Sequence, residues 1–177
     1  MKPMEENKSQ LLEYTMRAGL LLGLFWSFKY LFTIFGMSHP ALNGIGTLLS
    51  LGTPLLLFYF LVKYNREWLE NKMRFGQGVR FSILLFFFAS ILEALVVFIH
   101  VRWIDPTFIA NLFENIIETA QALALSTTII TQLAEQPLPN PFTYIFNNVI
   151  MANVFIGLLL SLLIVPMVRK FGPRINN

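Results

Sequence analysis

Residues 81–99 read FSILLFFFASILEALVVFI, and Glu93 is the only charged residue among them. A helix needs roughly 20 apolar residues to cross the hydrocarbon core of a bilayer. The run is continuously apolar, whereas a strand of a membrane β-barrel alternates apolar and polar residues. The stretch therefore predicts a transmembrane helix that carries one acidic group at membrane depth.

Four such stretches occur along the chain, at about residues 18–37, 43–62, 81–100 and 143–168. Hydrophobic residues make up 55% of the chain and charged residues 13%, about half the charged share of globular proteins. The first stretch contains Lys29, exceeds the apolar core of a signal peptide and lacks a nearby cleavage motif, so we expect an uncleaved span. The predicted fold is an all-α membrane protein with four transmembrane helices, in a single domain over residues 1–177.

Basic residues are distributed unevenly between the segments that join these spans. Lysine and arginine in short loops mark the cytoplasmic side of a membrane protein. The N-terminal segment, the second connection (63–80) and the C-terminus (169–177) together carry eleven of the thirteen basic residues. The first connection has none, the third (101–142) has only Arg102, and Lys29 lies within a span. We therefore predict a multi-pass protein of the cell inner membrane with both termini in the cytoplasm.

The third connection is long enough to fold, and it would lie outside the cytoplasm. Asp105 and Pro106 are typical of a helix start, with Asp as N-cap and Pro at the first helical position. Apolar residues then recur at three-and-four spacing, which predicts an amphipathic helix over about residues 106–125. They are Ile109, Leu112, Phe113, Ile116, Ile117, Ala120 and Leu123.

Two placements fit this helix. We expect it to pack on the outer ends of the bundle with Ile109, Leu112, Phe113 and Ile116 buried; binding to a partner is the alternative. The helix lacks the basic polar face of helices that lie on anionic lipid.

Two features predict local packing within the spans. Pro54 lacks a backbone N–H and leaves a carbonyl free in the second span, next to Ser50 and Thr53, so the helix is expected to break there. Gly19 and Gly23 form a small-residue pair one turn apart on the first span. Such a pair allows close helix approach, within the bundle as we expect, or in a dimer contact as the alternative.

Several short motifs accompany this order of spans. Residues 74–78 read RFGQG, residues 103–108 read WIDPTF, and the last span closes on Arg169 and Lys170. With the lysine-containing first span, this order resembles the uncharacterised membrane-protein family catalogued as domain of unknown function 4199, found mainly in Bacteroidota. The resemblance covers nearly the whole chain and implies a four-helix membrane domain. It brings no established activity, so it assigns no catalytic residue.

Three polar residues fall within the spans at one expected height. Lys29 and Glu93 lie roughly 18–20 Å beyond Arg17 and Arg80 at the rise of an α-helix, and Asn153 comes close to that level. Ionisable groups at this depth are costly and usually face a bundle interior or a cavity. We predict an intramembrane polar cluster, either as a structural Lys29–Glu93 ion pair or as a substrate or proton site. Two further alternatives are a Lys29 side chain that reaches the outer surface and a protonated Glu93.

The sequence lacks the motifs that are typical of several classes of protein. The chain has no cysteine, no nucleotide-binding or hydrolase motif and no basic patch for nucleic acid, and His39 and His100 lack metal-ligand spacing. We therefore expect no enzyme, cofactor, metal or nucleic acid. The favoured function is an accessory or scaffolding protein that associates with itself or with another membrane protein. The alternative is a small oligomeric transporter or proton-coupled permease that uses Lys29, Glu93 and Asn153 as its binding residues.

The distribution of basic residues gives a testable topology. Reporter fusions after Asn177 and within residues 64–79 should report the cytoplasm, and fusions near Ala41 and Gln121 should report the opposite side. Labelling of Ala41 from the cytoplasm would contradict the four-span topology.

Overall fold

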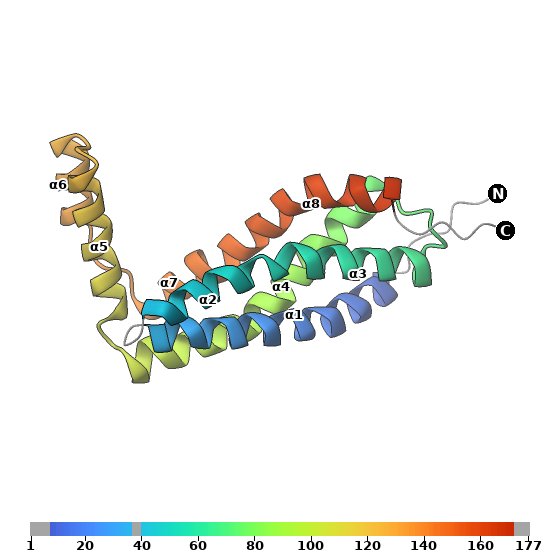
Figure 1. Ribbon diagram of the computed structural model, residues 1–177, viewed down its shortest axis with the longest axis horizontal. Helices are drawn as coiled ribbons and strands as arrows, with labels where there is room; N and C mark the ends of the chain where they lie inside the picture. The colour runs from blue at the N-terminus through green and yellow to red at the C-terminus, as the bar shows by residue number, and fades with distance from the viewer. Residues whose placement is uncertain (1–7, 37–39, 172–177) are drawn as a thin grey trace.

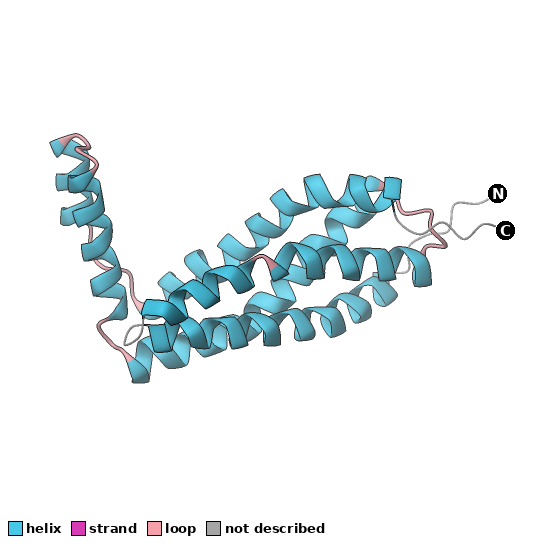
Figure 2. Ribbon diagram, viewed as in Figure 1, coloured by secondary structure: helices cyan, strands magenta, loops and turns pink. Residues whose placement is uncertain are grey.

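The computed structural model describes residues 8–36 and 40–171, and within these ranges every regular element is a helix (Figures 1 and 2). The α-helices are α1 (Lys8–Gly36), α2 (Pro40–Ser50), α3 (Gly52–Trp68), α4 (Phe75–Ile99), α5 (Phe108–Ala122), α6 (Thr127–Glu135), α7 (Pro141–Ile145) and α8 (Ala152–Phe171). Two short π-helices, η1 (His100–Ile104) and η2 (Phe146–Met151), continue α4 and precede α8.

Four helical stretches are long and apolar enough to cross a membrane, as the sequence predicts. They are Ser9–Gly36, Gly44–Trp68, Phe75–Ile104 and Pro141–Phe171. All four run along the long direction of the molecule, and α5 and α6 form a separate hairpin at one end (Figure 1). We call this hairpin the arm and the four long stretches the bundle.

The second span is interrupted where proline predicts a break. The α-helix stops at Ser50, Leu51 forms a turn by donating its N–H to the Leu48 carbonyl at 3.1 Å, and α3 starts at Gly52. Pro54 has no N–H to give to the carbonyl four residues earlier, so the helical hydrogen-bond ladder is incomplete there. Thr53, beside this break, is buried and accepts a hydrogen bond from the Trp26 indole at 3.0 Å.

Helix α1 packs most extensively on α4, and its glycines make this contact close. A Cβ atom at Gly19 would lie 2.6 Å from the Cβ of Phe88, and one at Gly23 would lie 2.7 Å from the carbonyl oxygen of Ala89. Both distances are too short for any side chain, so the two glycines serve packing within the bundle, as expected.

Helix α8 packs on another side of α4 in the same manner. A Cβ at Gly157 would lie 2.6 Å from the ring of Phe86, and that ring also meets Trp26 edge-on at 5.0 Å between centroids. Phe86 thus joins α1, α4 and α8 in one buried cluster, which continues through Tyr64 and Phe81. Phe86 and Phe81 are fully buried.

The arm does not lie over the ends of the bundle, which corrects the expected docking. Ile109 is buried against the bundle, Leu112 and Phe113 are half-buried, and Ile116 is 44% exposed. The chain turns after η1, so α5 leads away from the bundle and packs on α6 instead (Figure 1). Only the beginning of α5, from Phe108 to Phe113, therefore reaches the bundle core.

The buried Trp26–Thr53 hydrogen bond generates a stability prediction. Thr53→Val keeps the side-chain shape but removes the acceptor, which leaves the Trp26 N–H unpaired in the core. The free energy of unfolding in detergent should fall by about 1–3 kcal/mol. Thr33→Val, at an exposed position of α1, is the matched control and should have little effect. Equal stability of the two variants would show that this hydrogen bond contributes nothing.

Candidate functional site

Glu93 and Asn153 meet between α4 and α8. The Asn153 Nδ2 donates a hydrogen bond to the Glu93 Oε2 at 2.6 Å, and Glu93 is only 8% exposed. Gly157 lets α8 approach α4 one turn further along, and this approach brings Asn153 within reach of the carboxylate. The structure therefore brings together two of the three polar residues of the predicted cluster.

Lys29 does not form the predicted ion pair with Glu93. Within the described ranges no ion pair joins these residues. The helix register explains the difference. Equal heights above Arg17 and Arg80 would place Gly19 beside Ser82, but Gly19 lies beside Phe88 instead.

This shift in register displaces Lys29 along the bundle. Since α1 and α4 run in the same direction, the shift moves α1 residues toward the arm end relative to their expected partners on α4. Tyr30, the neighbour of Lys29, accordingly contacts His100, two helical turns beyond Glu93. Lys29 thus lies nearer the arm than the carboxylate does, and its side chain is half-buried.

A second polar pair, which was not predicted from the sequence, lies at the arm end of the bundle. The Tyr30 hydroxyl and the His100 Nδ1 are 2.8 Å apart, although the two residues are 70 positions apart in sequence. A Cβ atom at Gly19 would lie 3.3 Å from the backbone nitrogen of Ala89, and Tyr30 and His100 follow Gly19 and Ala89 by about three helical turns each. Had the register of α1 and α4 been known, this equal spacing would have revealed the pair.

His100 also connects the bundle to the arm. Its ring is fully buried and packs on the Phe108 ring at 4.8 Å, and its carbonyl accepts the Asp105 N–H at 2.8 Å. Asp105 in turn accepts hydrogen bonds from Thr107 through its Oδ1. Among the described residues, the His100 Nε2 and the Asp105 Oδ2 are two of the buried polar atoms without a hydrogen-bond partner. Within those residues no group of three or more His, Cys, Asp or Glu is placed to hold a metal ion, and His39 lies outside them.

Two π-helical segments flank these polar pairs. The first, η1, begins at His100, and the second, η2, ends at Met151, shortly before Asn153. A π-helical turn holds extra backbone and changes the direction in which the following side chains point, and such turns are frequent at functional sites. The two π-helical segments therefore lie beside two hydrogen-bonded pairs that join different helices.

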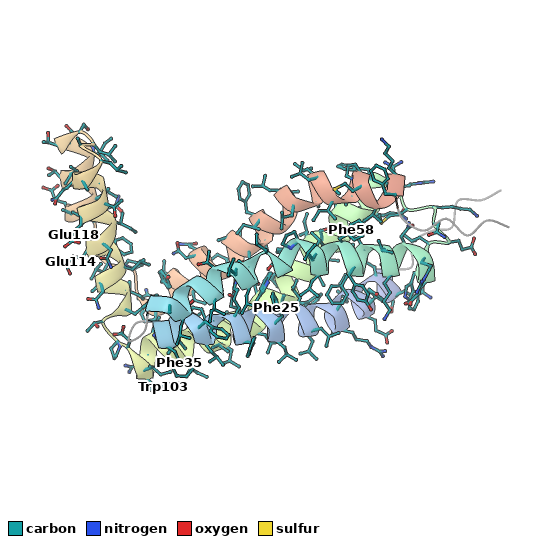
Figure 3. All side chains as sticks on the ribbon, viewed as in Figure 1. Phe25, Phe35, Phe58, Trp103, Glu114 and Glu118 are labelled. Carbon is teal, nitrogen blue, oxygen red and sulfur yellow. The ribbon has the colours of Figure 1, made fainter. Side chains whose placement is uncertain are left out.

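The arm carries a groove between α5 and α6 with a volume of about 530 Å³. Its lining includes Phe113, Ile117, Leu133 and Leu138, together with the glutamates Glu114 and Glu118. Figure 3 shows both glutamates on the side of the arm that faces away from the bundle. No lysine or arginine occurs between Trp103 and Val168, so the arm is acidic.

These elements define an all-helical protein with four candidate membrane spans and a separate helical hairpin. The chain belongs to the family described as Protein of unknown function (DUF4199), whose model matches residues 17–170. This match confirms the family to which the sequence motifs point. No curated protein and no solved structure matches the chain.

The polar contacts generate a second stability prediction. Glu93→Met and Asn153→Leu should each destabilise the protein, because either change leaves a buried polar partner unpaired, at a cost on the order of 1–3 kcal/mol. The double variant should recover part of this loss. The corresponding cycle of Glu93→Met with Lys29→Met should show a smaller coupling energy, because these residues form no direct ion pair. A larger coupling between Lys29 and Glu93 than between Asn153 and Glu93 would contradict the register described here.

Proposed function

We propose that this protein is a non-enzymatic accessory or scaffolding component of the inner membrane of a bacterium. The family resemblance implies that this bacterium belongs to the Bacteroidota. The protein acts by association with another membrane protein. The distribution of basic residues supports cytoplasmic termini and an arm on the opposite side. The observation that carries the proposal is the groove of the arm, whose lining combines apolar side chains with glutamates directed away from the bundle.

The charge of the arm selects the kind of partner. Glu114 and Glu118 line the groove, and the chain offers no basic residue from 103 to 168 to balance them. A second copy in the same membrane would present an equally acidic arm, so self-association through this groove would oppose like charges. A segment of another protein with lysine or arginine beside apolar residues would complement the groove in both charge and polarity.

Site-specific photo-crosslinking in cells tests this association. A photo-reactive residue in place of Gln121, which lines the groove, should give a discrete adduct with a second protein. The same residue at Asn115, an exposed position outside the groove lining, is the matched control. Reversing the charge with Glu114→Lys and Glu118→Lys should remove the adduct formed from position 121.

Three outcomes would overturn the proposal. They are the absence of any adduct from position 121, an adduct made of two copies of this chain, and equal adducts from positions 121 and 115. Equal adducts would show contact without use of the groove.

A small oligomeric, proton-coupled permease is the second candidate function. It is favoured by Glu93, which bonds to the amide of Asn153 on another helix and is not paired with Lys29. Protonatable groups held between helices at membrane depth are typical of proton paths. Proton flux into liposomes that contain the purified protein, measured with a pH-sensitive dye, separates the two candidates. Flux that depends on Glu93 and disappears in Glu93→Gln would support the permease, and equal flux with and without protein would exclude proton transport by this chain alone.

A further inference from the structure

The direction of the arm is set by the bundle. The four spans run along the long direction of the molecule, so this direction crosses the membrane. The arm runs crosswise to it, on the side of α7 and α8 (Figure 1). A hairpin with this direction extends along the membrane surface when the bundle is embedded in the bilayer.

The arm also leaves the bundle at the expected height of the membrane surface. Trp103, which is 68% exposed, lies at the arm end of the bundle, as does Phe35 (Figure 3). Tryptophan is enriched where hydrocarbon meets the headgroups, because its ring is apolar and its N–H is polar. Helix α5 begins at Phe108, within two helical turns of Trp103, and the chain re-enters the bundle at Pro141.

One face of α5 connects the bundle core with this surface. Ile109 is buried in the core of the bundle, and Leu112, Ile116 and Leu123 follow it at intervals of three, seven and fourteen residues. These intervals place all four side chains on one side of the helix. Ile116 is 44% exposed and Leu123 is 68% exposed. The face of α5 that touches the bundle at Ile109 therefore continues beyond the bundle, and no described residue covers the far end of this face.

The opposite face of α5 carries the charge. Glu114 and Glu118 lie about half a turn of the helix away from Ile116, and Figure 3 shows them directed away from the bundle. A helix that lies in the membrane surface has this arrangement, with an apolar face toward the acyl chains and a charged face toward water.

We infer that the arm lies on the bilayer, with Leu112, Ile116 and Leu123 seated at the boundary between headgroups and acyl chains and with Glu114 and Glu118 in water. The occupant of the apolar face is lipid, because beyond Ile109 the arm leaves the bundle on the side of α7 and α8 and extends over the lipid that surrounds the spans. An acidic arm without lysine or arginine gains nothing from anionic headgroups, so burial of apolar surface holds it on neutral or zwitterionic lipid. This placement leaves the groove accessible from water, and it does not depend on the proposed function.

Spin-label depth measurements test this placement. The chain has no cysteine, so a single introduced cysteine is labelled selectively. The full-length protein carrying Ile116→Cys or Leu123→Cys is reconstituted in phosphatidylcholine vesicles, and the collision rates of the nitroxide with oxygen and with a water-soluble nickel complex are compared. Oxygen concentrates in the bilayer and nickel in water, so the oxygen-to-nickel ratio should be several-fold higher at both positions than for Glu118→Cys, the matched control on the opposite face.

Each other pattern of collision rates overturns the inference. High nickel accessibility at positions 116 and 123 would mean that the arm stands clear of the bilayer. Low accessibility to both reagents would mean that protein, either a partner or a second copy, covers the apolar face. A depth at positions 116 and 123 that increases when phosphatidylglycerol is added to the vesicles would contradict the absence of electrostatic attraction.

Discussion

The close contact of α1 with α4 sets the arrangement of the rest of the bundle. Helices in a bilayer gain little from the hydrophobic effect when they associate, because lipid tails are as apolar as their side chains, and dense packing must supply the stability. Gly19 and Gly23 permit this packing by bringing the backbone of α1 against Phe88 and Ala89. Because α1 can approach α4 this closely only where its glycines face α4, the same contact also fixes the register of the two helices.

The register in turn decides which polar groups meet. It places Tyr30 beside His100, and α8 then brings Asn153 to Glu93. Many other buried hydroxyl groups bond within their own helices, as Ser82 and Ser161 do with backbone carbonyls. The few hydrogen bonds between helices are therefore the ones that depend on correct assembly. Two of them, Tyr30–His100 and Asn153–Glu93, lie beside the two π-helical segments, and a third, Trp26–Thr53, lies beside the break in the second span.

The sequence predicted those features that follow from composition along one chain segment. Length and hydropathy were sufficient for the four spans, and proline chemistry was sufficient for the break before Pro54. The sequence also predicted that Glu93 and Asn153 lie close together, because the height of each residue in the membrane could be counted along a regular helix. The predicted Lys29–Glu93 ion pair was wrong. Heights counted from Arg17 and Arg80 assume that these two residues lie level, whereas the contacts of Gly19 and Gly23 shift α1 along α4. The Tyr30–His100 pair was missed for the same reason, and the direction of the arm depends on the turn after Ile104, which periodicity does not encode.

The measurement that tests this account most directly compares glycine substitutions at the α1–α4 contact with one elsewhere. Gly19→Leu and Gly23→Leu should each lower the resistance of the protein to unfolding by sodium dodecyl sulfate in mixed micelles, followed by tryptophan fluorescence, to which the buried Trp26 contributes. Overpacking of this kind costs about 1–3 kcal/mol or more. Gly44→Leu should behave as the unmodified protein, because nothing lies within 4 Å of a Cβ atom at that position. Equal unfolding of all three variants and the unmodified protein would show that α1 and α4 do not pack through these glycines, and the register built on them would be wrong.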